Sequence, residues 1–474
     1  MTSRSNPETP IVPVNNVLAA NRGAHGNSRR SSSGLSRFFT NIADAGFELF
    51  SRKGKTDPQP VNKLANIRAE CHELLSTLGE ATGTALARKV LQAYLSLDVS
   101  EKYEFFVMLR QEFDIDKSEV RRIATTFVET DADSDLAALL ALAEPPRQEL
   151  FRRLNMAPDG TKALIEMRGS LLSMLSEHPD LRPVDQDFRH LFSSWFNRGF
   201  LQLKTIDWNS PAVVLEKLIE NESVHEMQGW DDLRRRLADD RRCFAFFHSA
   251  LPNEPLVFVE VALVRGLATE IAPIINGPVQ DESTMPWDTA IFYSINNCLK
   301  GLVGVSFGNF LIKQVVIELQ RDCPELTVFS TLSPVPRFRR WLEAMLTKNT
   351  SELGLNEDEI DAIKAVAAID WEQATHLESV LTHCIAYYLT HAKRNIYPLD
   401  PVARFHLRNG ARLDRINWMG DTSAERIQES YGFLVNYVYE SADIVGNHEN
   451  YIKNATVVTS DEVIRQAKQK GVLE

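Results

Sequence analysis

Three short motifs in the second half of the chain carry the residue types best suited to chemistry. The first is a glycine loop, Gly301–Gly308, between a strand-like segment and a helix-like one. Glycine lets backbone N–H groups approach a ligand closely, and the N-terminus of a helix attracts phosphate. No Gly-Lys-Ser/Thr follows, and no acidic residue is well placed about 20 residues on, which excludes a Walker loop and a dinucleotide fingerprint. The loop is therefore a candidate phosphate site, with a simple tight turn as the alternative.

A serine and a histidine form the other two motifs. Ser333 follows an apolar segment and precedes Pro334 and Pro336, which stiffen the turn. His406 lies among apolar residues and arginines, and Asp400 could orient its imidazole, although the spacing does not prove contact. Both residues are candidates for a site. A serine that caps a turn and a histidine buried in the core are the alternatives.

The elements that must position these residues differ between the two halves of the chain. From about residue 61 to residue 190, apolar residues recur at three-to-four spacing, which is typical of a helical bundle packed around Leu and Phe. No catalytic cluster is found there. The predicted helices are Ala69–Leu78, Ala85–Leu97, Lys102–Phe113 and Ala137–Leu154.

After Phe192, short runs rich in Phe and Val predict buried strands mixed with helices, as in an α/β or α+β domain. The predicted strands are Cys243–His248, Leu256–Leu263, Ala290–Ile295, Leu326–Ser330 and Leu434–Tyr439. The predicted helices are Phe307–Leu319, Ile360–Ala367 and Leu377–Ala392.

Composition narrows the function classes. The chain has 474 residues, of which 44% are hydrophobic, and a net charge of -12, which argues against a general nucleic-acid binder. Five scattered cysteines fit neither zinc ligation nor a disulfide framework, and no His/Asp/Glu cluster has metal-ligand spacing. No apolar run approaches the roughly 18 residues of a membrane span. We expect neither a metal, nor a membrane, nor a nucleic acid as a partner.

Residues 1–60 are rich in Ser, Asn, Arg and Pro, and we expect a disordered extension. A mitochondrial transit peptide is the alternative, but the amphipathic piece Arg37–Phe50 contains Asp44 and Glu48. The last residues lack a peroxisomal Ser-Lys-Leu address. These features favour a cytoplasmic protein of bacterial type.

Several long motifs, in the same order, resemble the malonyl-CoA decarboxylase family between about residue 61 and residue 440. They are Glu254–Val259, Ala290–Ile295, the glycine loop with Phe310–Lys313, Ser330–Pro336, Phe405–Ala411 and Arg415–Met419. The resemblance implies an α+β protein: an all-helical N-terminal bundle, residues 61–190, followed by a GNAT-like α/β catalytic domain, residues 191–474. It also implies a homo-oligomer that assembles through the helical domain.

The resemblance also assigns roles to residues. Ser333 and His406 match the catalytic serine and histidine of the family, and Ser294 matches a serine associated with the active site. The residues that match the malonyl-CoA contacts are Val303, Gly304, Val305, Ser306, Phe307, Gly308 and Asn309. Against the usual GNAT pyrophosphate pattern, Arg/Gln-x-x-Gly-x-Gly/Ala, the first and last positions depart, being Gly301 and Ser306.

The implied reaction converts malonyl-CoA into acetyl-CoA and carbon dioxide, with no cofactor. Its barrier is the negative charge that develops on the thioester oxygen, which preorganised donors lower without a metal. We expect His406 to protonate the resulting carbanion and Ser333 to donate a hydrogen bond to the substrate carboxylate. A GNAT-type acyltransferase and a non-catalytic malonyl-CoA sensor are the alternatives.

Overall fold

The computed structural model describes residues 63–76, 79–280, 286–305, 311–348, 352–365 and 371–468. The expected N-terminal extension, residues 1–60, lies outside the described residues. Within the described part of the chain, no helix is both long enough and apolar enough to cross a membrane.

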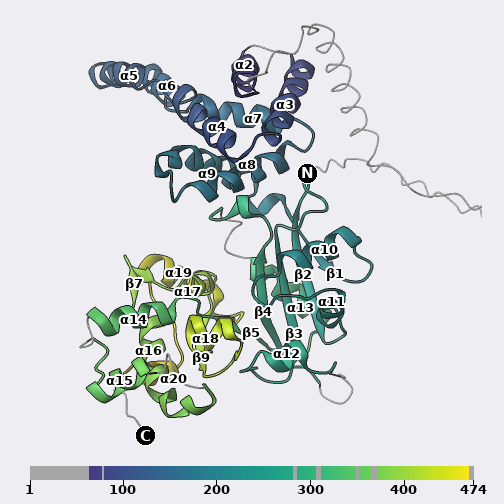
Figure 1. The fold of residues 1–474 in the computed structure, drawn as a ribbon, viewed down its shortest axis with the longest axis vertical. Helices are drawn as coiled ribbons and strands as arrows, with labels where there is room; N and C mark the ends of the chain where they lie inside the picture. The colour runs from purple at the N-terminus through teal and green to yellow at the C-terminus, as the bar shows by residue number, and fades with distance from the viewer. Residues whose placement is uncertain are drawn as a thin grey trace, which may run out of the picture. The chain divides into compact units, whose positions relative to one another are not determined.

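The first part of the described chain is helical, as predicted (Figure 1). Buried phenylalanines, among them Phe105, Phe151 and Phe188, form its core together with leucines from the same helices. Its longer helices are α2 (Lys63–Leu75), α3 (Glu80–Leu95), α4 (Val99–Glu112), α5 (Lys117–Thr130), α6 (Asp133–Leu142), α7 (Pro146–Asn155), α8 (Gly160–Met174) and α9 (Arg182–Trp195).

One of the predicted helices, Ala137–Leu154, is wrong. The chain forms two helices there, because α6 ends at Leu142 and α7 begins at Pro146. A proline inside a helix has no N–H to donate and its ring clashes with the preceding turn, whereas it fits the first helical position well. Pro145 and Pro146 therefore end one helix and start the next.

The second part is built on a mixed sheet that runs in the order β1-β2-β3-β4-β5-β10-β6, with β9 paired to β10. All of these pairs are antiparallel except β4 with β5. The strands are β1 (Leu201–Ile206), β2 (Arg241–His248), β3 (Val257–Val264), β4 (Thr289–Asn297), β5 (Val328–Thr331), β6 (Ser333–Pro334), β9 (Arg412–Asn417) and β10 (Leu434–Val438). The predicted order of a helical bundle followed by an α/β domain is confirmed.

Helices accompany this sheet along the rest of the chain. They are α10 (Ala212–Asn221), α11 (Trp230–Arg236), α12 (Ala272–Asn276), α13 (Leu311–Asp322), α14 (Phe338–Lys348), α15 (Glu357–Ala365), α16 (Glu378–Thr390), α17 (Pro401–Arg408), α18 (Ala424–Ser430), α19 (Ile444–Asn454) and α20 (Asp461–Lys468). A separate hairpin pairs β7 (Lys393–Arg394) with β8 (Tyr397–Pro398). The predicted start of helix Phe307–Leu319 lies outside the described residues.

The sheet opens between β4 and the chain that follows β5. The parallel pairing of these two strands stops at Phe292 and Thr331, where the Leu332 N–H still donates to the Phe292 carbonyl at 3.0 Å. Beyond that point β4 stays paired with β3, while β6 pairs with β10. Strand β4 and the chain that follows β5 therefore diverge, and the candidate site lies at the point where they separate.

Candidate active site

A cavity of about 490 Å³ lies at this opening. Its wall is mostly apolar, and its polar groups are few. Five candidates from the sequence line it: Ser294 on β4, Gly304 and Val305 in the glycine loop, Ser333 on β6 and His406 on α17. Arg408, two residues after His406 and the last residue of α17, also lines it. Residues more than 100 positions apart in sequence thus meet in one concave, largely apolar site of the kind that binds small molecules.

Ser333 and His406 are in direct contact. The Ser333 Oγ lies 3.1 Å from the His406 Nε2, and both residues are buried, at 6% and 3% exposure. Helix α17 carries the histidine. Its N-cap is Asp400, whose carboxylate accepts the Ala403 N–H at 2.8 Å, and a proline occupies the first helical position. Asp400 therefore caps the helix.

The second nitrogen of His406 contacts a residue that sequence reasoning did not select. The His406 Nδ1 lies 2.8 Å from the hydroxyl of Tyr439, and its ring stacks on Tyr437 with centroids 4.7 Å apart. Both ring nitrogens are thus occupied, by Ser333 and Tyr439, so Asp400 does not orient the imidazole as the sequence had suggested. Strand alternation places Tyr437 and Tyr439 on one side of the chain, which was the available signal.

Burial sets the charge states of His406 and Tyr439. It lowers the pKa of His406 to about 3, so the imidazole is neutral at neutral pH. Burial also raises the pKa of the Tyr439 hydroxyl well above its usual value, so this residue keeps its proton. Donation of that proton to Nδ1 leaves the histidine proton on Nε2, facing Ser333.

Thr331 continues the same line of hydrogen bonds. The Ser333 hydroxyl donates to the Thr331 Oγ1 at 2.8 Å, and the same Oγ1 accepts the Tyr437 N–H at 3.2 Å. Thr331 is fully buried and belongs to β5. The line therefore runs from Tyr439 through His406 and Ser333 to Thr331, and a substrate acceptor could replace Thr331 as the partner of the Ser333 proton.

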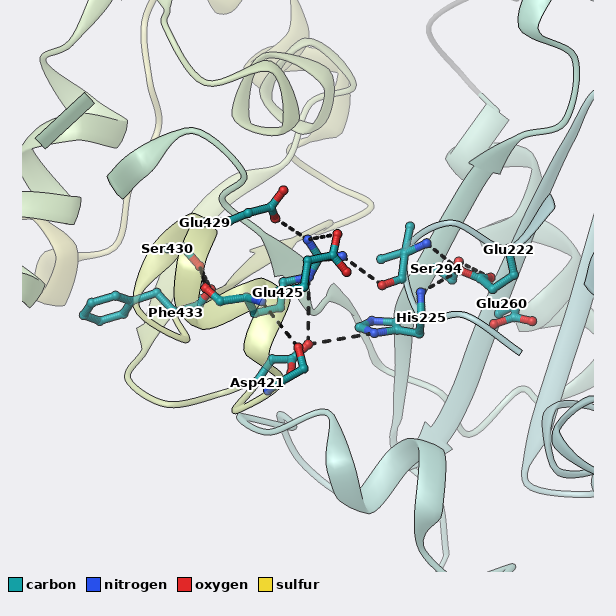
Figure 2. Close-up of polar contacts among 12 residues, drawn as sticks. Glu222, His225, Glu260, Ser294, Asp421, Glu425, Glu429, Ser430 and Phe433 are labelled. Carbon is teal, nitrogen blue, oxygen red and sulfur yellow. Dashed lines mark hydrogen bonds and ion pairs between the residues drawn. The ribbon is translucent and has the colours of Figure 1, made fainter. Parts of the chain in front are cut away.

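Ser294 lies in the same cavity wall but in a separate polar group. It is 2% exposed, and its Oγ donates to the carboxylate of Glu222 at 2.6 Å. The side-chain amide of Asn296 contacts both Glu222 and the Ser294 Oγ. Figure 2 shows Ser294 and Glu222 joined in this group. Neither Glu222 nor Asn296 was predicted from the sequence.

Two glycines of the loop serve packing and turn geometry. A Cβ on Gly301 would lie 1.8 Å from the Ile165 carbonyl oxygen in α8, so this glycine permits close packing. The buried Arg168 holds the loop there by donating to the Gly301 and Val303 carbonyls at 2.6 and 2.9 Å. Gly304, with φ of 76°, is the turn whose left-handed backbone favours glycine.

The predicted malonyl-CoA contacts are distributed unevenly. Gly304 and Val305 line the cavity, whereas Val303 does not line it and is 53% exposed. The other four predicted contacts lie outside the described residues; they are Ser306, Phe307, Gly308 and Asn309. Within the described ranges, no group of three or more His, Cys, Asp or Glu side chains is placed to hold a metal ion.

Comparison with known proteins decides the family. The model of the malonyl-CoA decarboxylase C-terminal domain matches residues 199–473, and that of the N-terminal domain matches residues 113–196. The chain belongs to the malonyl-CoA decarboxylase family. The Ser333–His406 contact and the cavity are therefore features of a family member, which agrees with the motifs noted in the sequence.

Relatives of known name cover most of the chain. The mitochondrial malonyl-CoA decarboxylase of Anser anser anser is 35% identical over 405 residues, which is 78% of this chain and 80% of the relative. The mouse mitochondrial protein is 34% identical over 407 residues, 78% of this chain and 83% of its own. The crystal structure of malonyl-CoA decarboxylase from Rhodopseudomonas palustris is 44% identical, with a TM-score of 0.82 over 86% of this chain and 100% of that one. The corresponding structure from Agrobacterium vitis is 44% identical, with a TM-score of 0.80 over 85% and 100%.

Proposed function

We propose that this chain converts malonyl-CoA and one proton into acetyl-CoA and carbon dioxide, and that Ser333 and His406 carry the reaction. The observation that supports this assignment is the contact between the two residues in the wall of a largely apolar cavity, with Tyr439 behind the histidine. Gly304 and Val305 line the same cavity and are assigned to the binding of the CoA portion. Ser294 is assigned to the same site.

The bond that breaks joins the carboxylate carbon of malonate to the carbon next to the thioester. Its electron pair moves into the thioester, giving an enolate whose oxygen carries the new charge. Ser333 holds the carboxylate by donating the hydroxyl proton that goes to Thr331 in the structure. The apolar wall favours the step because an ionised carboxylate is poorly solvated there, whereas neutral carbon dioxide is not penalised.

His406 then protonates the enolate carbon. Burial lowers the pKa of His406 to about 3, so the imidazole is neutral before the substrate binds. The substrate carboxylate brings a negative charge next to the ring, which raises that pKa and lets the imidazole take up a proton. Transfer of this proton to carbon restores the neutral ring, and each turnover consumes one proton from solvent. Tyr439 keeps the ring oriented throughout.

No metal or organic cofactor enters this scheme, because Ser333 binds the carboxylate and His406 supplies the proton. The test is to incubate the purified protein with malonyl-CoA and EDTA, without an acceptor amine. Acetyl-CoA formed in step with carbon dioxide is the expected result. Binding without carbon dioxide would favour a sensor, and turnover only after an amine is added would favour an acyltransferase.

We further propose that the helical domain, residues 61–190, joins copies of the chain into a homo-oligomer. Helices α5 and α6 pack on each other, yet neither has a buried residue, and Val128 and Leu140 are 82% and 66% exposed. Val128→Asp with Leu140→Asp should lower the mass measured by light scattering. Val279→Asp, at a site 53% exposed in the catalytic part, is the control and should leave the mass unchanged.

We place the enzyme in the cytoplasm. Two acidic residues in Arg37–Phe50 support this, because transit peptides are poor in acid, although two relatives are named as mitochondrial. A reporter fused to residues 1–60 distinguishes the compartments. Import into mitochondria, with removal of the segment, would contradict the cytoplasmic assignment.

A further inference from the structure

Glu222 follows helix α10 and is 5% exposed, and donors surround its carboxylate on both oxygens. Its Oε1 accepts the backbone N–H groups of Val224 and His225, each at 2.8 Å. Its Oε2 accepts the Ser294 hydroxyl at 2.6 Å and the Asn296 amide at 2.9 Å. All four partners are donors, so both carboxylate oxygens act as acceptors, and the two backbone contacts fix the loop that follows α10.

That loop is also held from its other side. Arg426 of α18 donates to the Val224 carbonyl at 2.9 Å, and it forms an ion pair with Glu429. Arg426 is 5% exposed, so the contact is shielded from solvent. Glu222 is therefore anchored through its own backbone neighbours and presents Oε2 to Ser294 in a fixed position.

The strand also aims Ser294 at this carboxylate. Strand β4 contains a register shift against β3: Ser294 pairs with Glu260 and Phe292 pairs with Val261, so Tyr293 is the extra residue. A bulge of this kind re-aims the neighbouring side chain. Ser294 lines the cavity while its hydroxyl reaches Glu222.

The Ser294 hydroxyl already makes two hydrogen bonds inside the protein. A serine hydroxyl has one proton and two lone pairs. The proton goes to Glu222, and one lone pair receives the Asn296 amide at 2.6 Å. What remains for the cavity is a lone pair. Toward a ligand, Ser294 is therefore a hydrogen-bond acceptor and has no proton to give.

We propose that Glu222 is a positioning residue that makes Ser294 an acceptor, and that Ser294 binds an amide N–H of the pantetheine arm of acyl-CoA. The reacting end of malonyl-CoA offers only acceptors: the carboxylate, the thioester oxygen and the enolate oxygen. The pantetheine arm carries two amide N–H groups, which match an acceptor. Ser294 thereby sets how deep the acyl group reaches toward Ser333 and His406. This inference rests on the proposed function for the identity of the substrate.

The test measures the affinity for free CoA by titration calorimetry, because CoA has the pantetheine arm and no thioester oxygen. Glu222→Gln keeps the shape of the side chain, but its amide nitrogen would donate to the Ser294 Oγ and release the serine proton into the cavity. A donor would then face the N–H of the ligand. We expect the Kd for CoA to rise about tenfold, the size of one mispaired hydrogen bond.

If Glu222→Gln fails to fold, Ser294→Ala tests the same contact. This variant should raise the Kd for CoA by a similar factor. Because Glu222 acts through Ser294, the double variant should have a Kd for CoA no higher than that of either single variant. The KM for malonyl-CoA should rise with the Kd, while kcat stays within about threefold. Glu254→Gln is the control, because the Glu254 carboxylate pairs with Lys162 and Lys217 and does not line the cavity. The Kd of this variant for CoA should equal that of the wild type.

Two results with the variants would overturn the proposal. One is an unchanged Kd for CoA in Ser294→Ala, with kcat reduced, which would place Ser294 at the thioester oxygen. The other is additive loss in the double variant, which would mean that Glu222 acts independently. Calorimetry needs no turnover, so a wild-type protein that binds CoA with these effects but releases no carbon dioxide would refute the proposed function and leave this inference standing. A wild-type protein that does not bind CoA would refute the inference itself.

Discussion

Replacing Gly301 by alanine should detach the glycine loop from helix α8. The new Cβ would lie 1.8 Å from the Ile165 carbonyl oxygen, whereas ordinary contacts begin at 3.4 Å, so the two backbones must separate by about 1.6 Å. Arg168, 1% exposed, would then lose its carbonyl acceptors on Gly301 and Val303. Overpacking together with an unsatisfied buried donor should lower the free energy of unfolding by about 3 kcal/mol.

The same change should weaken substrate binding, because Gly304 and Val305 follow directly and line the cavity. Urea unfolding and the KM for malonyl-CoA are the measurements. Gly169→Ala is the matched control: it lies in α8 on the same contact, but its Cβ would be 3.6 Å from the Gly301 nitrogen, an ordinary distance. If both variants unfolded at the same urea concentration with the same KM, the close packing at Gly301 would not hold the loop.

Three further outcomes follow from the Ser333–His406 pair. Tyr439→Phe should lower kcat about tenfold with little change in KM, because the imidazole loses its orienting partner; equal kcat would refute that role. Ser333→Ala should abolish most turnover, whereas Ser330→Ala, whose hydroxyl bonds only backbone among the contacts described, should retain it in the same carbon dioxide assay. Burial lowers the pKa of His406 to about 3, whereas its value in the unfolded chain is about 6.5. Between these two pH values the unfolded chain binds a proton that the folded protein does not, so the free energy of unfolding falls as the pH falls. His406→Gln should therefore flatten the decline in urea stability between about pH 6 and pH 4 by up to about 1.4 kcal/mol per pH unit, and parallel curves would contradict it.

Local sequence patterns predicted much of the architecture. Apolar runs such as Cys243–His248 and Ala290–Ile295 fall within β2 and β4, because a buried strand needs apolar side chains on both faces. The break between α6 and α7 was missed, although Pro145 and Pro146 signalled it. The prediction followed the helical spacing of the leucines, whereas in the structure the two prolines end one helix and start the next.

The candidate site was predicted only in part, for a physical reason. Ser333 and His406 stand in recognisable motifs, so they could be selected before their contact was known. Glu222 reaches Ser294 across 72 positions of sequence, and nothing local marks it. Tyr439 was assigned to a strand, and only the fold brings its hydroxyl to the histidine. Partners that act through another side chain have no motif of their own, because contact in space selects them.

The most direct test compares binding with turnover in His406→Asn. This change removes the proton donor while keeping a polar side chain of similar size in the cavity. We predict that the Kd for malonyl-CoA stays within a few-fold of the wild-type value, whereas release of carbon dioxide falls by a factor of about 100 or more, the usual contribution of a positioned acid. Near-normal release of carbon dioxide from this variant would contradict the assignment of His406 as the residue that protonates the enolate.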